Sequence, residues 1–275
     1  MLMRLRERRV FKPWGRTDIP EQFGGSSDER LGEIWFEREE GGSDDPLLVK
    51  YLFTSERLSV QVHPDDASAW KAGHSCGKDE AWVVLSAEPG AGIGIGLDRP
   101  TSPQDLRSAA LDGSIAGMLD WREVEAGDAF YSPAGTLHSI GAGLTLLEVQ
   151  QNCDVTYRLY DFGRPRELHL DQGVAAARTD SAVGKSVERT VGNGRSVVAQ
   201  GPKFTLERWR SGPGRIEASK AEPLWLIPTQ DTVAANRTAL PSASVWIADE
   251  PVELEIEDGG EMLIAYEGSI VRAAA

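Results

Sequence analysis

The stretch LSVQVHPDDASAWKAGHSCGKDE, residues Leu58–Glu80, decides the fold that this sequence predicts. Its first part alternates apolar and polar residues, and side chains two apart on a strand point to the same face. Gln61 and His63 therefore project together, and the valines on either side of Gln61 point the other way. The proline that follows ends the strand, because it lacks the N–H that a sheet ladder needs.

Two later segments bring more candidate ligands toward this strand. Glu80 directly precedes the apolar run Ala81–Leu85, which predicts a second strand, and His138 ends the turn sequence PAGTLH. On adjacent strands of a β-barrel, oxygen and nitrogen side chains of this kind suit a divalent metal. The four candidate ligands are Gln61, His63, Glu80 and His138. The plainer alternative is that Glu80 caps its strand and His63 ends a loop.

Composition and charge narrow the class of protein. The chain has 275 residues, enough for one large or two modest domains, and its eight tryptophans argue against disorder. Its net charge of −14 argues against non-specific binding to nucleic acid. No stretch reaches the length of a membrane span, and no apolar run follows the basic N-terminus. Cys76 and Cys153 have no metal-ligand spacing and are expected to be unpaired thiols. We therefore expect a cytoplasmic protein.

Short strands separated by Gly, Pro and Asp turns predict an all-β cupin or jelly-roll barrel. Residues 101–120 are the one convincing helical region, and residues 66–73 suit a helical turn. Residues 1–46 are expected to be mostly loop, with one short strand at 31–37. A polar segment, 179–195, predicts a linker before a second, smaller β domain. The expected domains are thus 1–185, which carries the metal and the chemistry, and 186–275, which has no histidine and is expected to hold no metal.

Several motifs resemble those of one enzyme family. Glu125–His138 (EAGDAFYSPAGTLH) has the pattern of a cupin barrel's second metal motif. Together with LSVQVHPDD, GKDE, DVTYR at 154–158 and DFGRPRELHLD at 161–171, it makes the chain resemble type I phosphomannose isomerases, most closely the short bacterial members. The resemblance covers residues 10–178. The C-terminal third matches loosely, as the degenerate second cupin that such members carry.

The resemblance implies interconversion of mannose 6-phosphate and fructose 6-phosphate through an enediol. It implies one Zn²⁺ per chain, held by the four candidate ligands named above. It also implies proton transfer near Lys78 and an active site that includes Asp154 and Arg158. Larger members carry a histidine immediately before the lysine, whereas this chain has Gly77, and it also lacks their large helical insertion. The proton-transfer role is therefore less firmly implied than the metal site.

The expected partner is a small sugar phosphate, with no nucleic acid and no membrane; the oligomeric state is not predicted. The phosphate requires cationic donors, and we expect them among Arg158, Lys50, Arg164 and Arg166. Because glutamine is an unusual zinc ligand, iron, manganese or cobalt would suit the same set. Two alternatives stay open: a non-catalytic sugar-phosphate-binding or regulatory cupin, and a metal-dependent oxygenase. The oxygenase is the weaker one, because the usual two-histidine, one-carboxylate spacing is absent.

Overall fold

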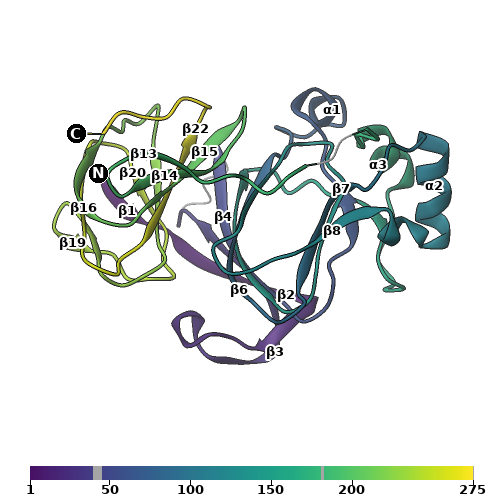
Figure 1. Ribbon diagram of the computed structural model, residues 1–275, viewed down its shortest axis with the longest axis horizontal. Coiled ribbons are helices and arrows are strands. Elements are labelled where there is room, and N and C mark those ends of the chain that lie inside the picture. Colours follow the sequence, from purple (N-terminus) through teal and green to yellow (C-terminus); the bar gives the residue numbers. More distant parts are fainter. Residues whose placement is uncertain (40–44, 181–182, 275) are drawn as a thin grey trace.

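The structure, a computed structural model, describes residues 1–39, 45–180 and 183–274. Strands dominate these residues and form four antiparallel sheets, so the predicted all-β class is confirmed. Two sheets enclose what we call the first barrel, and the other two enclose the second barrel. Figure 1 shows the first barrel toward the helices and the second barrel toward both chain termini.

Two sheets, of six and five strands, form the first barrel. The six-stranded sheet has the order β2 (Arg6–Asp18), β3 (Ser26–Glu37), β4 (Leu47–Thr54), β11 (Leu144–Gln151), β6 (Glu80–Ala87) and β9 (Ala129–Ser132). The five-stranded sheet has the order β12 (Tyr157–Tyr160), β5 (Val60–Val62), β10 (His138–Ile140), β7 (Gly92–Leu97) and β8 (Leu119–Glu123).

Sheets of seven and four strands form the second barrel. The larger has the order β1 (Leu2–Arg4), β20 (Trp246–Ala248), β17 (Leu224–Pro228), β22 (Met262–Glu267), β15 (Phe204–Trp209), β14 (Arg195–Gln200) and β13 (Arg189–Gly192). The smaller has the order β16 (Gly212–Ile216), β21 (Val252–Ile256), β18 (Val233–Ala235) and β19 (Thr238–Ala239).

The central strands of the six-stranded sheet, β4 and β11, are buried on both faces. Every residue of β4 is buried, because alternate side chains serve two different cores. Val49 and Tyr51 pack in a core shared with the seven-stranded sheet, together with Phe204 and Trp225. Leu52, one position along, packs instead inside the first barrel. The two barrels are thus joined by an apolar core rather than by a linker alone.

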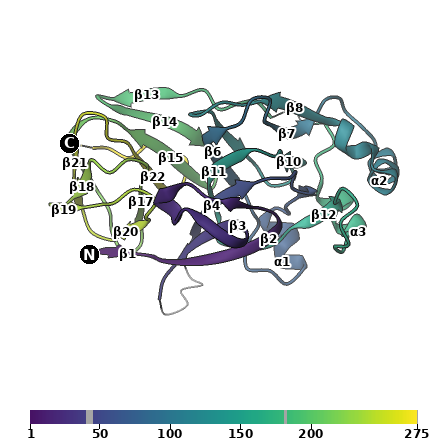
Figure 2. The same cartoon turned by 90° about the horizontal axis from the view of Figure 1, so that it is seen from below.

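Helices cover the outer face of the five-stranded sheet (Figure 2). They are α2 (Pro103–Asp112), which packs there with the outward side chains of β5 and β12, and α3 (Leu170–Ala176), in contact with β12. Val60 and Val62 point into this outer core, as the alternation of the opening stretch predicts. The predicted helical region is confirmed over a shorter length, since Ser102 caps α2 and Gly113 ends it at φ 83°. The predicted helical turn is α1 (Asp66–Lys71), and two 3₁₀ turns, η1 (Glu21–Phe23) and η2 (Ser114–Gly117), complete the elements.

The expectation that residues 1–46 are mostly loop is wrong. They contain β2 and β3, which pair as a long hairpin. Pro13 and Gly15 misled the prediction, because they lie where the register shifts between Phe11 and Arg16 and where β2 is an edge strand. Residues 40–44 of that segment lie outside the described residues.

The expected linker at 179–195 contains β13, and α3 was not predicted. Residues 181–182 lie outside the described part of the chain. β1 pairs with β20, so the first strand of the chain completes the sheet of the second barrel (Figure 2). The division into residues 1–185 and 186–275 stays a prediction.

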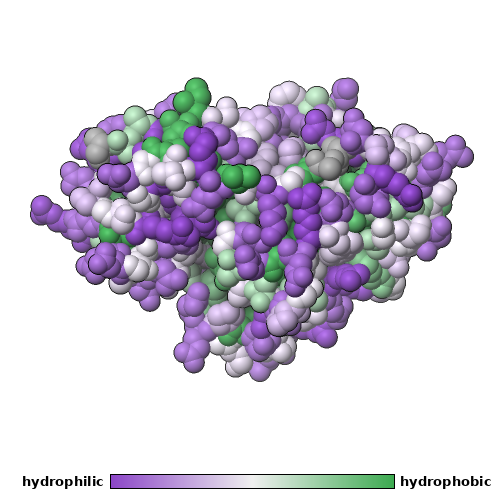
Figure 3. All heavy atoms as spheres, viewed as in Figure 1, coloured by the Kyte–Doolittle hydropathy of each residue, from purple (hydrophilic) through white to green (hydrophobic). Residues whose placement is uncertain are grey.

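The face shown in Figure 3 is dominated by hydrophilic side chains, with small separate apolar patches. Among the helices described, none is long and apolar enough to cross a membrane.

Candidate functional site

Strand alternation places a set of charged side chains inside the first barrel. On β3, β4, β6 and β11 the residues next to each of them in sequence pack toward the second barrel, so these point inward. All four are buried, and they are Glu33, Lys50, Glu80 and Glu148. Charged side chains are rarely buried without a partner or a ligand, so the interior of this barrel needs a functional explanation.

Three of the four predicted metal ligands converge at one point. Ligand atoms of His63, Glu80 and His138 all lie within 4.8 Å of one another, and all three side chains are buried. The pairing of the five-stranded sheet explains part of this convergence, since His138 lies opposite Gln61 on β5. Glu80 comes from the other sheet, at the first residue of β6.

The hydrogen bonds of His63 and His138 fix which ring nitrogen of each carries the proton. As a result, hydrogen-bond acceptors of these rings face the acceptor oxygens of Glu80. Nδ1 of His63 lies 2.7 Å from the carbonyl oxygen of Val155, and Nδ1 of His138 lies 3.0 Å from that of Thr136. A carbonyl only accepts, so each Nδ1 carries the proton and each Nε2 offers a lone pair. Yet these Nε2 atoms face the Glu80 carboxylate, at 3.3 Å from His63 and 3.5 Å from His138.

This arrangement fits a cation. Nε2 of His63 and Oε2 of Glu80 are buried and have no hydrogen-bond partner among the described residues. Burial lowers the pKa of His63 to about 4, more than the Glu80 charge raises it, so the ring is neutral at pH 7. Two neutral imidazoles held by backbone carbonyls, with a carboxylate between them, are the donor set and the supporting hydrogen bonds of a divalent-metal site.

Gln61 lies beside this group. Its Nε2 is 3.2 Å from Nε2 of His138, and its Oε1 accepts a hydrogen bond from Ser59. The two ends of a side-chain amide exchange places by a half turn, which would present Oε1 to this group instead. The glutamine is therefore within reach as a fourth ligand.

Lys78 contacts the cluster of His63, Glu80 and His138, which we call the metal group. The side chain is buried, and its Nζ lies 2.8 Å from Oε1 of Glu80. Burial lowers the pKa of Lys78, but the charges of Glu80 and Glu148 raise it by a larger amount. The pKa of Lys78 is therefore above its ordinary value. Burial likewise opposes ionisation of Glu80, yet the facing His63 side chain and the charged Lys78 hold its pKa below the ordinary range. Lys78 is therefore a charged donor in this structure.

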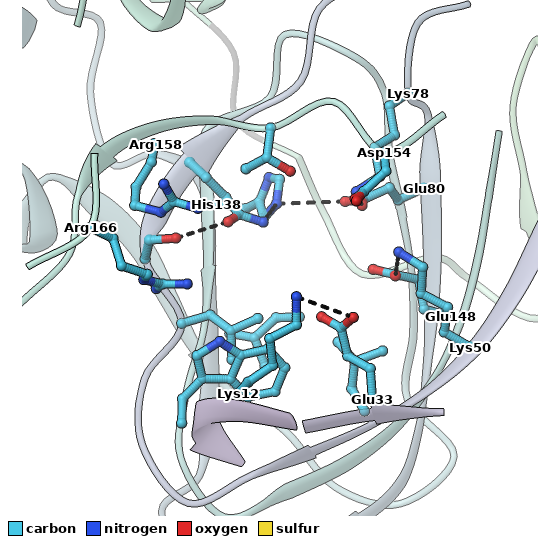
Figure 4. A pocket seen from close by; sticks show the side chains of 17 residues that line it. Lys12, Glu33, Lys50, Lys78, Glu80, His138, Glu148, Asp154, Arg158 and Arg166 are labelled. Carbon is cyan, nitrogen blue, oxygen red and sulfur yellow. Dashed lines mark hydrogen bonds and ion pairs between the residues drawn. The ribbon is translucent and has the colours of Figure 1, made fainter. Parts of the chain in front are cut away.

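A cavity of about 240 Å³ is lined by Glu80 and His138 together with other charged side chains (Figure 4). Lys50 lines it but is already paired: its Nζ lies 3.3 Å from Glu148, 2.5 Å from Oε1 of Gln150 and 4.2 Å from the centre of the Trp35 ring. Asp154 also lines the cavity and is exposed. The three predicted catalytic residues thus all line this cavity; they are Arg158, Lys78 and Asp154.

Arg158 keeps its charge unpaired. Its Nη1 donates to the carbonyl of Glu167, its Nε is buried without a partner, and no carboxylate pairs with it among the described residues. An ion pair between Asp154 and Arg158 was the alternative that the sequence allowed, and no such pair forms among the described residues. Arg166 also lines the cavity, and it and Arg164 share the carboxylate of Asp161. Figure 4 shows Arg158 and Arg166 together, across the cavity from Lys78 and Asp154.

Sequence reasoning missed several residues of the cavity. Glu148 is buried, accepts a hydrogen bond from Nε1 of Trp82, and has a pKa raised mainly by burial. Glu33 accepts from Nε1 of Trp35 and lies 3.6 Å from Nζ of Lys12. A signal for Glu148 was present, since it interrupts the apolar run LTLLEVQQ of β11. Lys12 had none, because its segment was expected to be loop.

Comparison with known proteins shows which family has this fold and these motifs. Over 194 residues, the chain is 38% identical to mannose-6-phosphate isomerase from Streptococcus mutans, an alignment that covers 66% of this chain and 60% of that one. It is 36% identical over 194 residues to a putative mannose-6-phosphate isomerase of Bacillus subtilis, covering 65% of this chain and 61% of the relative. The chain thus spans about three fifths of the length of these curated relatives. No family model matches the chain.

Solved structures extend the likeness to nearly the whole chain. The crystal structure of mannose 6-phosphate isomerase from Bacillus subtilis superposes with a TM-score of 0.82 at 25% identity, over 96% of this chain and 99% of that one. A zinc-bound mannose 6-phosphate isomerase superposes with a TM-score of 0.74 at 12% identity, over 97% of this chain and 99% of that one, and shows the fold alone. The resemblance to type I phosphomannose isomerases is therefore confirmed, in sequence across 66% of the chain and in fold across 96% of it.

Proposed function

We propose that this protein is a metal-dependent aldose–ketose isomerase that interconverts mannose 6-phosphate and fructose 6-phosphate. One observation carries the proposal: two imidazole lone pairs and a carboxylate converge at a cavity that is also lined by Arg158, which has no carboxylate partner among the described residues. The names of the relatives point to the same reaction. A sugar phosphate needs both features, one for its carbonyl end and one for its phosphate.

We propose that one zinc ion is held by Gln61, His63, Glu80 and His138. When bound, a divalent metal there polarises the sugar's carbonyl and hydroxyl oxygens and stabilises the charge that develops on them. Lys78 neutralises part of the Glu80 charge and offers a further N–H donor at the same end of the cavity. Its pairing with Glu80 supports a role in orienting the sugar hydroxyls rather than in accepting a proton.

The isomerisation needs a group that carries a proton between C1 and C2 through an enediol, and we propose Glu148. Its carboxylate is buried in the cavity wall, and burial raises its pKa toward the range in which a carboxylate both accepts and returns a proton. Trp82 fixes one oxygen, and Lys50 lies beside the other, so the carboxylate is held in one orientation. Lys50 acts here on Glu148, in addition to its proposed contact with substrate.

The phosphate is proposed to lie at Arg158, with Arg166 beside it. Arg158 is partly buried and has no carboxylate partner among the residues described, so its guanidinium is available to an anion. Asp154 is proposed to accept hydrogen bonds from sugar hydroxyls at the exposed edge of the cavity. Holding the sugar at both ends fixes C1 and C2 near Glu148, which is the positioning that the reaction requires.

The experiment is an assay of the purified protein on a panel of sugar 6-phosphates, each with and without a chelator. The proposal predicts conversion of mannose 6-phosphate to fructose 6-phosphate that the chelator abolishes. The alternative function, a non-catalytic sugar-phosphate-binding cupin, predicts binding of the same sugars without conversion. Turnover of another sugar phosphate alone would correct the substrate and keep the reaction class.

A further inference from the structure

The loop that carries Lys78 and Glu80 donates backbone hydrogen bonds to acceptors that lie outside the metal group. The N–H of Gly77 donates to Oδ1 of Asp66 at 2.7 Å, and the N–H of Lys78 donates to the carbonyl of Pro64 at 3.1 Å. The N–H of Asp79 donates to Oε1 of Gln151 at 3.0 Å. Three successive backbone donors of the loop are therefore fixed.

Gly77 is packed against the segment that supplies these acceptors. A Cβ at this position would lie 2.6 Å from the backbone N of Asp66 and 2.7 Å from the carbonyl oxygen of Pro64. Both are backbone atoms that have no room to move. This contact gives a physical reason for glycine where larger relatives of the resembled family carry histidine, and it ties the loop closely to the start of α1.

Asp66 is in turn held by the second barrel. Its Oδ2 lies 2.5 Å from Nζ of Lys203, and its Oδ1 also accepts from Nε2 of Gln151 at 3.1 Å. Lys203 lies in the turn between β14 and β15, and the turn rests on the first barrel. A Cβ at Gly201 would meet the ring of Tyr131 at 1.9 Å, so only glycine allows that approach.

The same turn is connected to the loop by a second path. The hydroxyl of Tyr131 donates to Oδ2 of Asp79 at 2.7 Å and accepts from the N–H of Lys203 at 3.4 Å. The other oxygen of Asp79 accepts from the N–H of Ala134, in the turn that leads to His138. Asp79 thus connects the segments that carry Glu80 and His138.

From these contacts we infer that Lys203 is a positioning residue, through which the second barrel holds the loop Gly77–Glu80 in the geometry that the metal site needs. Among the described residues the second barrel contributes no ligand to that site, yet Lys203 holds the Asp66 carboxylate, which accepts from the first N–H of the loop. The inference rests on the proposed function for its zinc-binding and kinetic consequences. The positioning itself is a property of the metal-free protein.

The test compares Lys203→Met with Lys185→Met. Lys185 pairs with Asp128 at 2.5 Å, and its side chain is 39% exposed against 36% for Lys203, so it is a matched ion pair outside this network. Amide hydrogen exchange of the metal-free proteins is measured over residues 74–82. Removing a partly exposed charged contact predicts roughly three- to tenfold faster exchange there for Lys203→Met and no change for Lys185→Met.

Two further measurements separate positioning from general stability. Competition with a chelator is expected to show weaker zinc binding by Lys203→Met, and isomerase kinetics a lower kcat with little change in KM, since Arg158 and Arg166 lie elsewhere. Lys203→Arg should recover part of each loss. If Lys203→Met does not fold, Asp66→Asn removes the same ion pair from its other end. Unchanged exchange and zinc affinity would overturn the inference, whereas an unmodified protein that binds zinc but converts no sugar would overturn the proposed function instead.

Discussion

Each barrel buries a glutamate on one of its strands, but only one of the two carboxylates has hydrogen-bond partners for both oxygens among the described residues. In the second barrel, Glu207 is fully buried and accepts hydrogen bonds from the guanidinium of Arg195, from Nε1 of Trp209 and from the hydroxyl of Tyr266. In the first barrel, Glu80 is paired with Lys78 on one oxygen, while its other oxygen has no hydrogen-bond partner in the part of the chain that the structure describes.

The difference distinguishes a structural network from a candidate binding site. The polar side chains that contact the Glu207 carboxylate, Arg195, Trp209 and Tyr266, all donate to it, so the carboxylate needs no ligand and the network stabilises its barrel. Around Glu80 two near neighbours are lone pairs of His63 and His138, so a cation between these acceptors is favourable. The same residue type in the same kind of barrel thus has two roles, decided by whether its neighbours donate or accept.

The largest effect is expected from removing a ligand. His138→Ala should weaken metal binding by at least about a hundredfold, because even residues that merely support a ligand contribute 10- to 100-fold. Metal analysis after dialysis checks this, with the unmodified protein expected to hold one equivalent. A variant that retains a full equivalent with unchanged affinity would show that the site is elsewhere.

The matching change in the second barrel should affect stability alone. Glu207→Ala leaves the partly buried guanidinium of Arg195 without its carboxylate; breaking a fully buried pair typically costs about 3–5 kcal/mol, so we expect a loss toward the lower end of that range. Urea unfolding of the metal-free protein measures the loss. Metal stoichiometry of the folded fraction should stay at one per chain. A loss of metal from this variant, with stability intact, would reverse the roles assigned to the two barrels.

At the cavity, Arg158→Ala should lose about 2–4 kcal/mol of transition-state stabilisation, the scale of one missing charged contact, with metal content intact. Lys78→Ala should behave similarly, with a larger share of the loss in kcat. Lys78→Arg should not rescue fully, because it keeps the charge but misplaces it. Steady-state kinetics on metal-loaded variants decide the matter. Near-normal kcat/KM for both alanine variants would place the anion elsewhere, at Lys50 or Arg164.

A smaller, pH-dependent effect is expected at Asp161. Burial raises its pKa, but hydrogen bonds from Arg166 and Arg164 lower it further, so the folded pKa lies below the ordinary value of 3.8. A lowered folded pKa gives stability that is present above the ordinary pKa and is lost as the pH falls through the folded one. Asp161→Asn should therefore be less stable by about 2 kcal/mol near neutral pH, and the gap should close below pH 4 or so. Urea titrations at several pH values test this, and a gap that is constant down to pH 2 would exclude the carboxylate as its source.

The sequence could predict the position of a side chain only where the pattern of apolar and polar residues showed which face of its strand it lies on. The alternation around Gln61 placed that residue and His63 correctly, because β5 has an apolar outer face and a polar inner one. β4 reads LLVKYLFT and is buried on both faces, so alternation gave no direction for Lys50 beyond the possibility that it points inward. Its partner Glu148 lay in an apolar run of the same kind and was passed over.

The N-terminal hairpin was lost for a different reason. Pro13 and Gly15 are loop signals in most contexts, and only the neighbouring strands show that they sit at a register shift of an edge strand. Lys12 and Glu33 were missed with it. The contact of Lys203 with Asp66 was also beyond sequence reasoning, because the two residues are 137 positions apart and meet only when the barrels pack.

The central claim is that the unsatisfied acceptors of the first barrel hold a metal that the reaction needs. The most direct measurement strips the purified protein with a chelator, removes the chelator, and titrates zinc while following conversion of mannose 6-phosphate to fructose 6-phosphate. The account predicts no conversion at the start and a rise that reaches its plateau at one zinc per chain. Full conversion by the stripped protein, or a plateau unrelated to binding at His63, Glu80 and His138, would contradict it.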